Sequence, residues 1–177
     1  GVEKDRVREL ARMTAGHEEL LADTATPYLT RTAQGARIPR PRHIFIILGE
    51  TYAQWPMLDQ YTAFHAADGI RGLVAEPNAY YSRRFMPNGD FTSIAITGLV
   101  TGLSEIGQHV NYVPRSLREA YPTAMAPQFK QLGYAVDFWY GGVPSWEGMD
   151  RFSTAQGFDH FYGYPDFHAT KVNAWGT

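Results

Sequence analysis

An acidic residue follows directly after a strongly apolar stretch of the chain. The run from Ile44 to Leu48 is continuously hydrophobic, Gly49 interrupts it, and Glu50 comes next. A continuous apolar run predicts a strand that is buried on both faces, as in a parallel sheet. Sites in open α/β sheets form at the carboxyl ends of strands, so Glu50 stands where a ligand carboxylate would stand. The alternative interpretation is an ordinary loop carboxylate.

A second stretch places hydroxyl groups at the predicted start of a helix. The sequence NGDFTSIAITGLVTGL covers residues 88–103, and its first two residues are a turn signal. Asp90 is expected to cap the helix 92–103, whose first turn holds Thr92 and Ser93. A hydroxyl there faces backbone N–H groups without helical partners, which suits a phosphate and a nucleophilic oxygen. The alternative is a plain helix cap, which is the commoner role of such a threonine.

The elements around these residues have to position them. Apolar spacing and turn residues predict two strands and three helices: a strand at 43–48, a helix at 92–103, a helix that begins at Pro122 and continues over 124–132 to Gly133, a strand at 134–140 and a helix at 146–156. Weaker signals predict a partly helical stretch at 57–67 and a short strand at 72–75. The alternation of strands and helices favours an α/β fold with a mostly parallel sheet.

The composition excludes several classes of protein. The 177 residues are 44% hydrophobic, which is enough for one domain with a core. The formal net charge of −2 gives no sign of the basic stripe that is typical of nucleic-acid-binding proteins. The absence of cysteine excludes disulfides and thiolate metal sites. No apolar run approaches the roughly 20 residues that cross a bilayer, so the chain is expected to be soluble; a membrane segment upstream is neither shown nor excluded.

Four blocks of sequence, taken together, resemble a known family. They are HIFIILGET, NGDFTSIAITGLVTGL, MAPQFKQLGYAVDFWYGG and W…RF…GFDHF, in that order over residues 43 to about 163. They look like the first half of a sulfatase-type catalytic domain of the alkaline phosphatase superfamily. They are most similar to the lipoteichoic acid synthase and phosphoglycerol transferase branch. The resemblance implies an incomplete alkaline-phosphatase-like α/β fold, with a mostly parallel central sheet and helices on both faces.

The resemblance also divides the chain into two parts. Residues 1–42 would be an N-terminal helix, expected over 2–22, followed by a linker that contains proline and glycine. Residues 43–177 would be the N-terminal part of a sulfatase-like catalytic domain. The remaining metal ligands of the family, an Asp-His pair and a further His, would lie beyond Thr177. The pair Asp159-His160 is not taken as their substitute, because GFDHF matches a structural stretch of the family.

The resemblance assigns roles to individual residues. In the family, an acid after the first strand binds Mn²⁺ or Mg²⁺, and a threonine at a helix start is both nucleophile and metal ligand; Glu50 and Thr92 match these positions. Tyr140 and Gly141 stand where the phosphoglycerol branch usually has a His-Gly pair, and Trp146 matches its substrate-binding tryptophan. The arginine that usually follows two residues later is absent here. These three residues are candidates for substrate binding, although the replacements put the phosphoglycerol substrate in question.

The implied activity is a metal-dependent double displacement. A phosphorylated headgroup, of the phosphoglycerol type, would pass from a phospholipid donor to the threonine and then to a glycan or lipid acceptor of the cell envelope. The parent protein would be extracytoplasmic and anchored in a membrane by segments outside this chain. With only two metal ligands, the 177-residue chain is expected to be inactive by itself.

Two alternatives to this function stay open, and a true sulfatase is less well supported than either. A phosphoethanolamine transferase, or a related metal-dependent phosphodiester hydrolase, would use the same nucleophile, although the former often carries disulfides. A true sulfatase needs a modified Cys or Ser in a Cys/Ser-x-Pro-x-Arg setting, which the sequence lacks. The alternative from another class is a catalytically silent fragment or binding module.

Overall fold

The computed structural model describes residues 39–50, 53–83, 85–87, 89–103, 109–168 and 170. The chain divides into two compact units, and each is considered separately. We call residues 39–87 the N-terminal unit, and the described part of residues 88–177 the core unit. The predicted helix at 2–22 and most of the predicted linker lie outside the described residues, so the proposed division at residue 42 stays a prediction.

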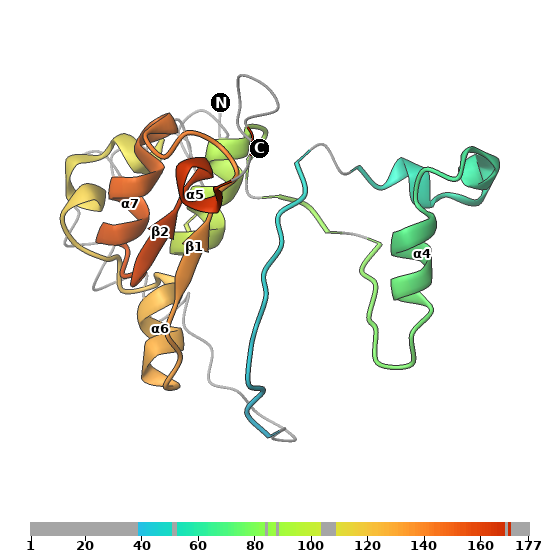
Figure 1. Cartoon of the computed structure of the whole chain (residues 1–177), viewed down its shortest axis with the longest axis horizontal. Helices are drawn as coiled ribbons and strands as arrows, with labels where there is room; N and C mark the ends of the chain where they lie inside the picture. The colour runs from blue at the N-terminus through green and yellow to red at the C-terminus, as the bar shows by residue number, and fades with distance from the viewer. Residues whose placement is uncertain are drawn as a thin grey trace, which may run out of the picture. The chain divides into compact units, whose positions relative to one another are not determined.

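The core unit alternates helices with two short strands (Figure 1). Its α-helices are α5 (Thr92–Thr101), α6 (Met125–Gln131) and α7 (Met149–Ala155). Its strands are β1 (Asp137–Trp139) and β2 (His160–Tyr162). Four short 3-10 helices complete it: η4 (Val110–Tyr112), η5 (Pro114–Leu117), η6 (Trp146–Gly148) and η7 (Tyr164–Phe167).

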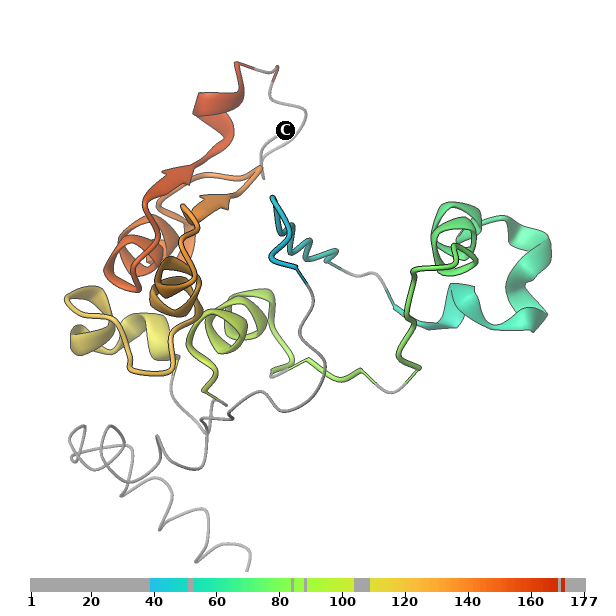
Figure 2. The same cartoon turned by 90° about the horizontal axis from the view of Figure 1, so that it is seen from below.

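The two strands form a parallel pair, which lies beside α7 (Figure 2). Residues 137, 138 and 139 pair with residues 160, 161 and 162 in register. Because side chains alternate along a strand, Phe138 and Phe161 point to one face, where they stack 5.3 Å apart and pack against the core. Trp139 and Tyr162 stack on the opposite face, and Trp139 is exposed.

The core lies between the helices and the inner face of this sheet. It is formed by hydrophobic side chains from α5, η4, α6, α7 and the turn before β2: Ile96, Val100, Val110, Ala126, Met149, Phe152 and Phe158. Gly157 has a positive φ of 95°, and a Cβ at this position would approach the ring of Pro127 to 3.1 Å. The glycine therefore allows the chain to turn tightly from α7 towards β2 against the start of α6.

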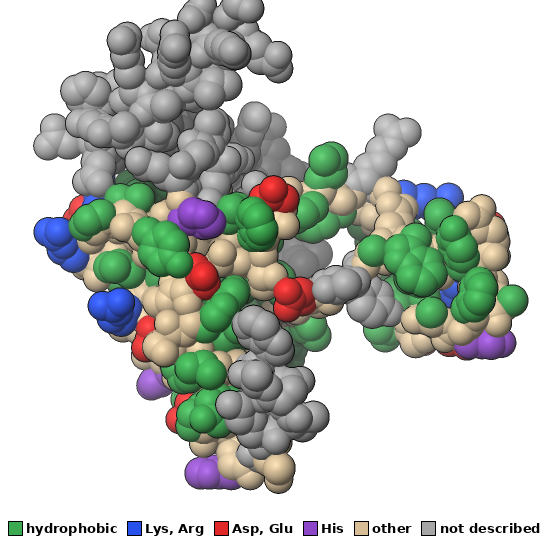
Figure 3. Space-filling model, turned by 90° about the horizontal axis from the view of Figure 1, so that it is seen from above, with side chains coloured by type: hydrophobic (Ala, Val, Ile, Leu, Met, Phe, Trp, Pro, Cys, Tyr) green, Lys and Arg blue, Asp and Glu red, His purple; other side chains and the backbone are tan. Residues whose placement is uncertain are grey.

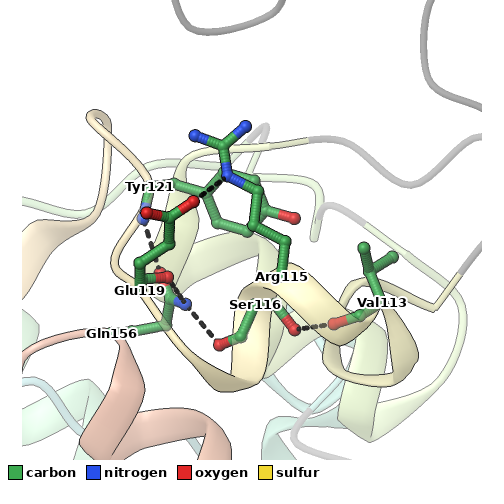
Figure 4. Close-up of polar contacts among 6 residues, drawn as sticks. All are labelled: Val113, Arg115, Ser116, Glu119, Tyr121 and Gln156. Carbon is green, nitrogen blue, oxygen red and sulfur yellow. Dashed lines mark hydrogen bonds and ion pairs between the residues drawn. The ribbon is translucent and has the colours of Figure 1, made fainter. Parts of the chain in front are cut away.

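A buried glutamine joins the end of α7 to η5 and to the segment that follows η5 (Figure 4). The Gln156 side chain is fully buried, and its Nε2 donates to the carbonyl oxygens of Ser116 at 2.7 Å and Glu119 at 3.0 Å. Its Oε1 accepts from the backbone N–H of Tyr121 at 2.9 Å. One side chain thus forms hydrogen bonds with three backbone groups, one in η5 and two in the irregular segment after it.

The N-terminal unit is a small helical unit with little buried surface. It contains η2 (Trp55–Met57), η3 (Asp59–Phe64) and α4 (Asp68–Val74). Arg71 joins them, because its guanidinium donates to the carbonyl oxygens of Pro56 and Leu58 at 3.2 and 3.0 Å. Figure 3 shows many hydrophobic side chains on the surface of this unit, and Ala67 is the one described hydrophobic residue there that is buried.

Two strand predictions are wrong. Residues 43–48 have extended backbone without a ladder, and the side chains from Ile44 to Leu48 are 45 to 88% exposed. Continuous apolarity predicts burial, but a strand also needs a neighbour for its backbone groups, and the described residues provide none. The predicted strand at 72–75 is the end of α4, where the N–H of Ala75 donates to Arg71 O. Its run of small and apolar residues is too short to separate the two periodicities.

The other predicted elements agree with the structure. The helices expected at 92–103, 122–132 and 146–156 correspond to α5, α6 and the η6–α7 pair, and the strand expected at 134–140 contains β1. Helix α6 begins at Met125, however, and Pro122 lies in the turn before it. The stretch 57–67 is partly helical, as η3. The α/β class with parallel pairing is therefore confirmed in outline. In the described residues, however, the sheet has two strands: the core packs against one face, and Phe167 of η7 stacks on Trp139 at the other.

Candidate active site

Thr92 is the first residue of α5. The preceding Phe91 has extended backbone (φ −119°, ψ 153°) and makes no side-chain cap, while its carbonyl accepts the first helical bond from Ala95 at 2.9 Å. The predicted cap by Asp90 is therefore not formed. The N–H groups of the first turn have no carbonyl one turn earlier inside the helix, so the positive end of α5 lies at Thr92.

Burial distinguishes the two neighbouring hydroxyl groups. Thr92 is half-buried, whereas Ser93 is only 6% exposed. A nucleophile has to be reached by its substrate, so Thr92 is the better candidate of the two. This is the order of preference that the sequence predicted, and burial adds a physical reason for it.

Contacts at both ends of α5 fix the position of the helix. On one side, a Cβ at Gly89 would lie 2.0 Å from Ile94 Cγ2, so only glycine lets the chain approach the first turn this closely. On the other side, Thr97 and Thr101 are fully buried, and Thr101 Oγ1 donates to Thr97 O at 2.7 Å. Thr123 Oγ1 donates to Thr101 O at 2.5 Å and joins the helix end to the segment before α6. A helix held in this way presents its first residue in a defined direction.

Glu50 belongs to the other unit. It lies in a turn directly after the extended stretch 43–48, and its side chain is exposed. Thr92 lies in the core unit, and the placement of the units relative to each other is not determined. The pairing of Glu50 with Thr92 around one cation therefore stays a prediction. Among the residues that the structure describes, no three His, Asp or Glu side chains gather as a metal site would require.

The three predicted substrate-binding residues lie at the carboxyl end of β1. Tyr140 continues the ladder, because its N–H donates to Tyr162 O at 2.8 Å. Its ring stacks on Trp146, with centroids 5.6 Å apart and planes inclined by 25°. The Tyr140 ring also lies against Gly142, where a Cβ would come within 2.6 Å of it. We call Tyr140 and Trp146 the aromatic shelf; both are half-buried, and the exposed Gly141 follows directly after Tyr140.

Sequence reasoning missed the contacts that hold this shelf. Asn111 Nδ2 donates to the carbonyl oxygen of Glu147 at 2.6 Å, and the Tyr112 hydroxyl donates to Glu147 Oε2. The hydrogen bond to Glu147 raises the pKa of Tyr112, and burial and the carboxylate charge act in the same direction. Glu147 and Gly148 both have positive φ, of 52° and 66°. The local sequence signal for this turn is Gly148, two residues after Trp146. No sequence motif links the turn to residues 111 and 112.

Asp159 and His160 have structural partners at the opposite end of the strands. Asp159 Oδ1 pairs with Lys130 Nζ at 2.6 Å, and its Oδ2 accepts from the backbone N–H of Val136 at 2.8 Å. The Lys130 ammonium, and then the Val136 N–H, hold the pKa of Asp159 below its ordinary value. His160 Nδ1 lies 2.9 Å from Asp137 Oδ1. These residues join β1 to β2 at their amino ends, which is a structural role.

Comparisons with known proteins give one partial similarity. No model of a known protein family matches the sequence, and no curated protein matches it. A solved structure from Vibrio parahaemolyticus, described as a protein in the alkaline phosphatase superfamily, is 25% identical with a TM-score of 0.43. The match covers 48% of this chain and 21% of that one. A TM-score this low does not establish a common fold, so the function has to be inferred from the residues of this chain.

No helix within the described residues is both long enough and apolar enough to cross a membrane.

Proposed function

We propose that this chain is part of a metal-dependent phosphotransferase of the alkaline phosphatase superfamily. In the proposed reaction, Thr92 takes a phosphoglycerol-type headgroup from a phospholipid and passes it to a glycan or lipid acceptor of the cell envelope. The position of Thr92 carries the proposal: a half-buried hydroxyl at the first residue of α5, beside N–H groups suited to a phosphate. The four sequence blocks that resemble the superfamily support it.

The proposed chemistry is a double displacement at phosphorus. Thr92 Oγ1 forms a bond to the phosphorus atom of the donor, and the bond from phosphorus to the diacylglycerol oxygen breaks. The proton lost by Thr92 leaves on the diacylglycerol hydroxyl. The hydroxyl of the acceptor then attacks the phosphothreonine, the headgroup moves to the acceptor, and Thr92 regains a proton. The first-turn N–H groups of α5 stabilise the charge on the phosphate oxygens in both steps.

Glu50 and Thr92 are the residues that would hold a cation. A carboxylate and a hydroxyl are the hard oxygen donors that Mn²⁺ and Mg²⁺ prefer, so the donor set fits either ion. When bound, the cation would favour the threonine alkoxide and offset the charge of the phosphate. Two protein ligands are fewer than the roughly six donors that such ions take, so other parts of the parent protein have to complete the site. We therefore expect residues 1–177 alone to be inactive.

The aromatic shelf would contact the headgroup. Stacked, half-buried rings offer an apolar surface to the glycerol carbons and leave the hydroxyl groups to polar partners. Because the donor is a membrane lipid and the acceptor an envelope polymer or lipid, we infer that the parent protein works outside the cytoplasm. Its anchoring in the membrane would come from segments outside this chain.

The test is to trap the covalent intermediate in the parent protein. The protein would be incubated with phosphatidylglycerol vesicles and Mn²⁺, quenched in acid, digested and analysed by mass spectrometry. We expect a glycerophosphoryl adduct on Thr92, no adduct in Thr92→Ala, and a residual adduct in Thr92→Ser. With phosphatidylethanolamine vesicles in place of phosphatidylglycerol, an adduct on Thr92 with the mass of phosphoethanolamine would instead identify the alternative headgroup.

Two results would contradict the proposal. One is full turnover by Thr92→Ala, which would remove Thr92 as the nucleophile. The other is an adduct on Ser93 in the wild-type protein, which would mean that the buried hydroxyl becomes accessible. Glu50→Gln is the matched variant for the metal: it keeps the shape of the side chain but should weaken Mn²⁺ binding, which calorimetry measures without any turnover.

A further inference from the structure

The loop after β1 contains a residue in an unfavourable backbone conformation. Glu147 has φ 52° and ψ 17°, and the next residue, Gly148, is also left-handed. Glycine adopts this conformation at little cost, but a residue with a side chain does so only where the surrounding structure holds it. Glu147 directly follows Trp146, one of the two rings of the aromatic shelf.

Two consecutive residues of η4 hold Glu147 in this conformation. Asn111 binds its backbone carbonyl and Tyr112 binds its side-chain carboxylate. These contacts join positions that are 36 and 35 residues apart in the sequence. The η4 helix is itself fixed, because Val110 lies in the core. The loop is therefore held from outside by an anchored element, and not by its own turn chemistry alone.

The loop has its own backbone bonds at its base. Trp146 N–H donates to Val143 O at 2.9 Å, and Asp150 N–H donates to Pro144 O at 3.2 Å. These bonds close the turn, while the contacts to Glu147 fix its tip directly after Trp146. The two sets of bonds leave the Trp146 ring against Tyr140 and beside the core. Loss of the outer contacts would free Glu147 to leave the left-handed region and move Trp146 with it.

The burial of these contacts argues against a role in stability alone. Tyr112 is 58% exposed, so water competes for its hydrogen bond, and the bond contributes only modestly to the stability of the fold. Asn111 is 1% exposed, and its Oδ1 has no hydrogen-bond partner among the described residues. Because this amide is buried, loss of its bond to Glu147 O would leave a buried donor without a partner, and this cost keeps the Glu147 carbonyl in place.

We propose that Asn111 and Tyr112 are positioning residues: through Glu147 they hold Trp146 against Tyr140 and so set the geometry of the headgroup-binding shelf. This inference rests on the proposed function for the identity of the ligand, but not for the positioning itself. Neither residue has to touch the headgroup. Their effect on the reaction is to keep one of its binding surfaces in a single conformation.

The first test measures positioning without any reaction. The indole N–H resonance of Trp146, assigned with Trp146→Phe, would be recorded by NMR in the parent protein or its catalytic domain. Tyr112→Phe removes one hydroxyl, and Glu147→Gly removes both the carboxylate and the backbone strain; each should shift or broaden the resonance. Tyr80→Phe is the matched control, because Tyr80 is exposed in the N-terminal unit. An unmoved Trp146 resonance in both variants would overturn the proposal.

The second test uses the lipid donor. In Tyr112→Phe, KM for phosphatidylglycerol should rise roughly three- to tenfold with kcat nearly unchanged, the size expected for one lost hydrogen bond. Glu147→Gln keeps an acceptor for Tyr112 and should retain most of the wild-type KM. An unchanged KM in Tyr112→Phe would overturn the role in headgroup binding. If the wild-type parent protein transfers no headgroup at all, the proposed function fails, and the NMR test still decides the positioning.

Discussion

The apolar stretch 43–48 and helix α5 are both rich in large hydrophobic side chains, but these side chains are mostly buried in α5 and exposed in 43–48. In the core unit, Ile96 and Val100 of α5 are buried among side chains of α6, η4 and α7. In the N-terminal unit, the side chains from Ile44 to Leu48 remain exposed. The two segments differ in what they need from the rest of the chain. A helix satisfies its own backbone and only has to bury one face, whereas a strand also needs a hydrogen-bonded neighbour.

This difference extends to the two units as wholes. The core unit encloses fully buried residues such as Phe152 and the Gln156 side chain, whereas the N-terminal unit buries only Ala67 among its described hydrophobic residues. Hydrophobic burial is the main source of stability, so the core unit should account for most of the free energy of unfolding. Substitutions can test this expectation in matched pairs, one from each unit.

The largest effect is expected from the centre of the core unit. Phe152→Ala removes a fully buried ring and should lower the free energy of unfolding by about 3–5 kcal/mol. The matched variant is Phe64→Ala in the N-terminal unit, where the ring is exposed and the loss should stay within about 0.5 kcal/mol. Urea denaturation followed by circular dichroism measures both. Equal losses in the two variants would mean that the units do not differ in the way proposed.

A smaller effect is expected from the buried glutamine. Gln156→Met keeps the volume of the side chain but leaves Ser116 O, Glu119 O and Tyr121 N without their partner. The free energy of unfolding should fall by about 2–4 kcal/mol, because unmet buried backbone groups are costly. Gln131→Met, at the exposed end of α6, is the control. A loss below about 0.5 kcal/mol in Gln156→Met would show that water replaces these bonds.

The sequence predicted the helices better than the sheet, for physical reasons. Helix α6 ends beside a glycine with positive φ, and such local signals mark helix ends wherever the rest of the chain lies. The strand at 137–139 was predicted, but its partner at 160–162 was not, because pairing depends on contacts 23 residues away. The shelf residues came from family resemblance. The contacts of Asn111 and Tyr112 with Glu147 could not be predicted, because no motif joins them.

A pH-dependent effect is expected from the ion pair between Lys130 and Asp159. The pKa of Asp159 is lowered in the folded chain, so the pair stabilises the fold above the ordinary value of 3.8. That contribution is lost as the pH falls through the lowered pKa. Asp159→Asn should therefore reduce stability at neutral pH and flatten its decline in acid. Thermal melts between pH 7 and acid measure this.

The companion variant for that experiment is Lys130→Met. It removes the same ion pair from the other side, although Asp159 keeps its bond to the Val136 N–H. We expect a partial flattening of the acid decline, smaller than that of Asp159→Asn. An acid profile identical to the wild type in both variants would contradict a stabilising role for the pair.

The smallest effect is expected in the apolar stretch itself, and it bears most directly on the comparison between 43–48 and α5. Ile47 is 88% exposed, so Ile47→Ala removes little buried surface and should change the free energy of unfolding by less than about 0.5 kcal/mol. Ile96→Ala makes the same chemical change in α5, where the side chain is buried, and should cost about 2–5 kcal/mol. Both are measured by urea denaturation of residues 1–177, and then of the parent protein. If Ile47→Ala causes a small loss in residues 1–177 and a large loss in the parent protein, the parent protein covers the stretch 43–48. Glu50, which follows directly, would then be fixed in place by the burial of the residues before it. If Ile47→Ala causes a small loss in both proteins, Glu50 follows an exposed segment. That result would contradict a metal site in which burial of residues 43–48 holds Glu50 in place.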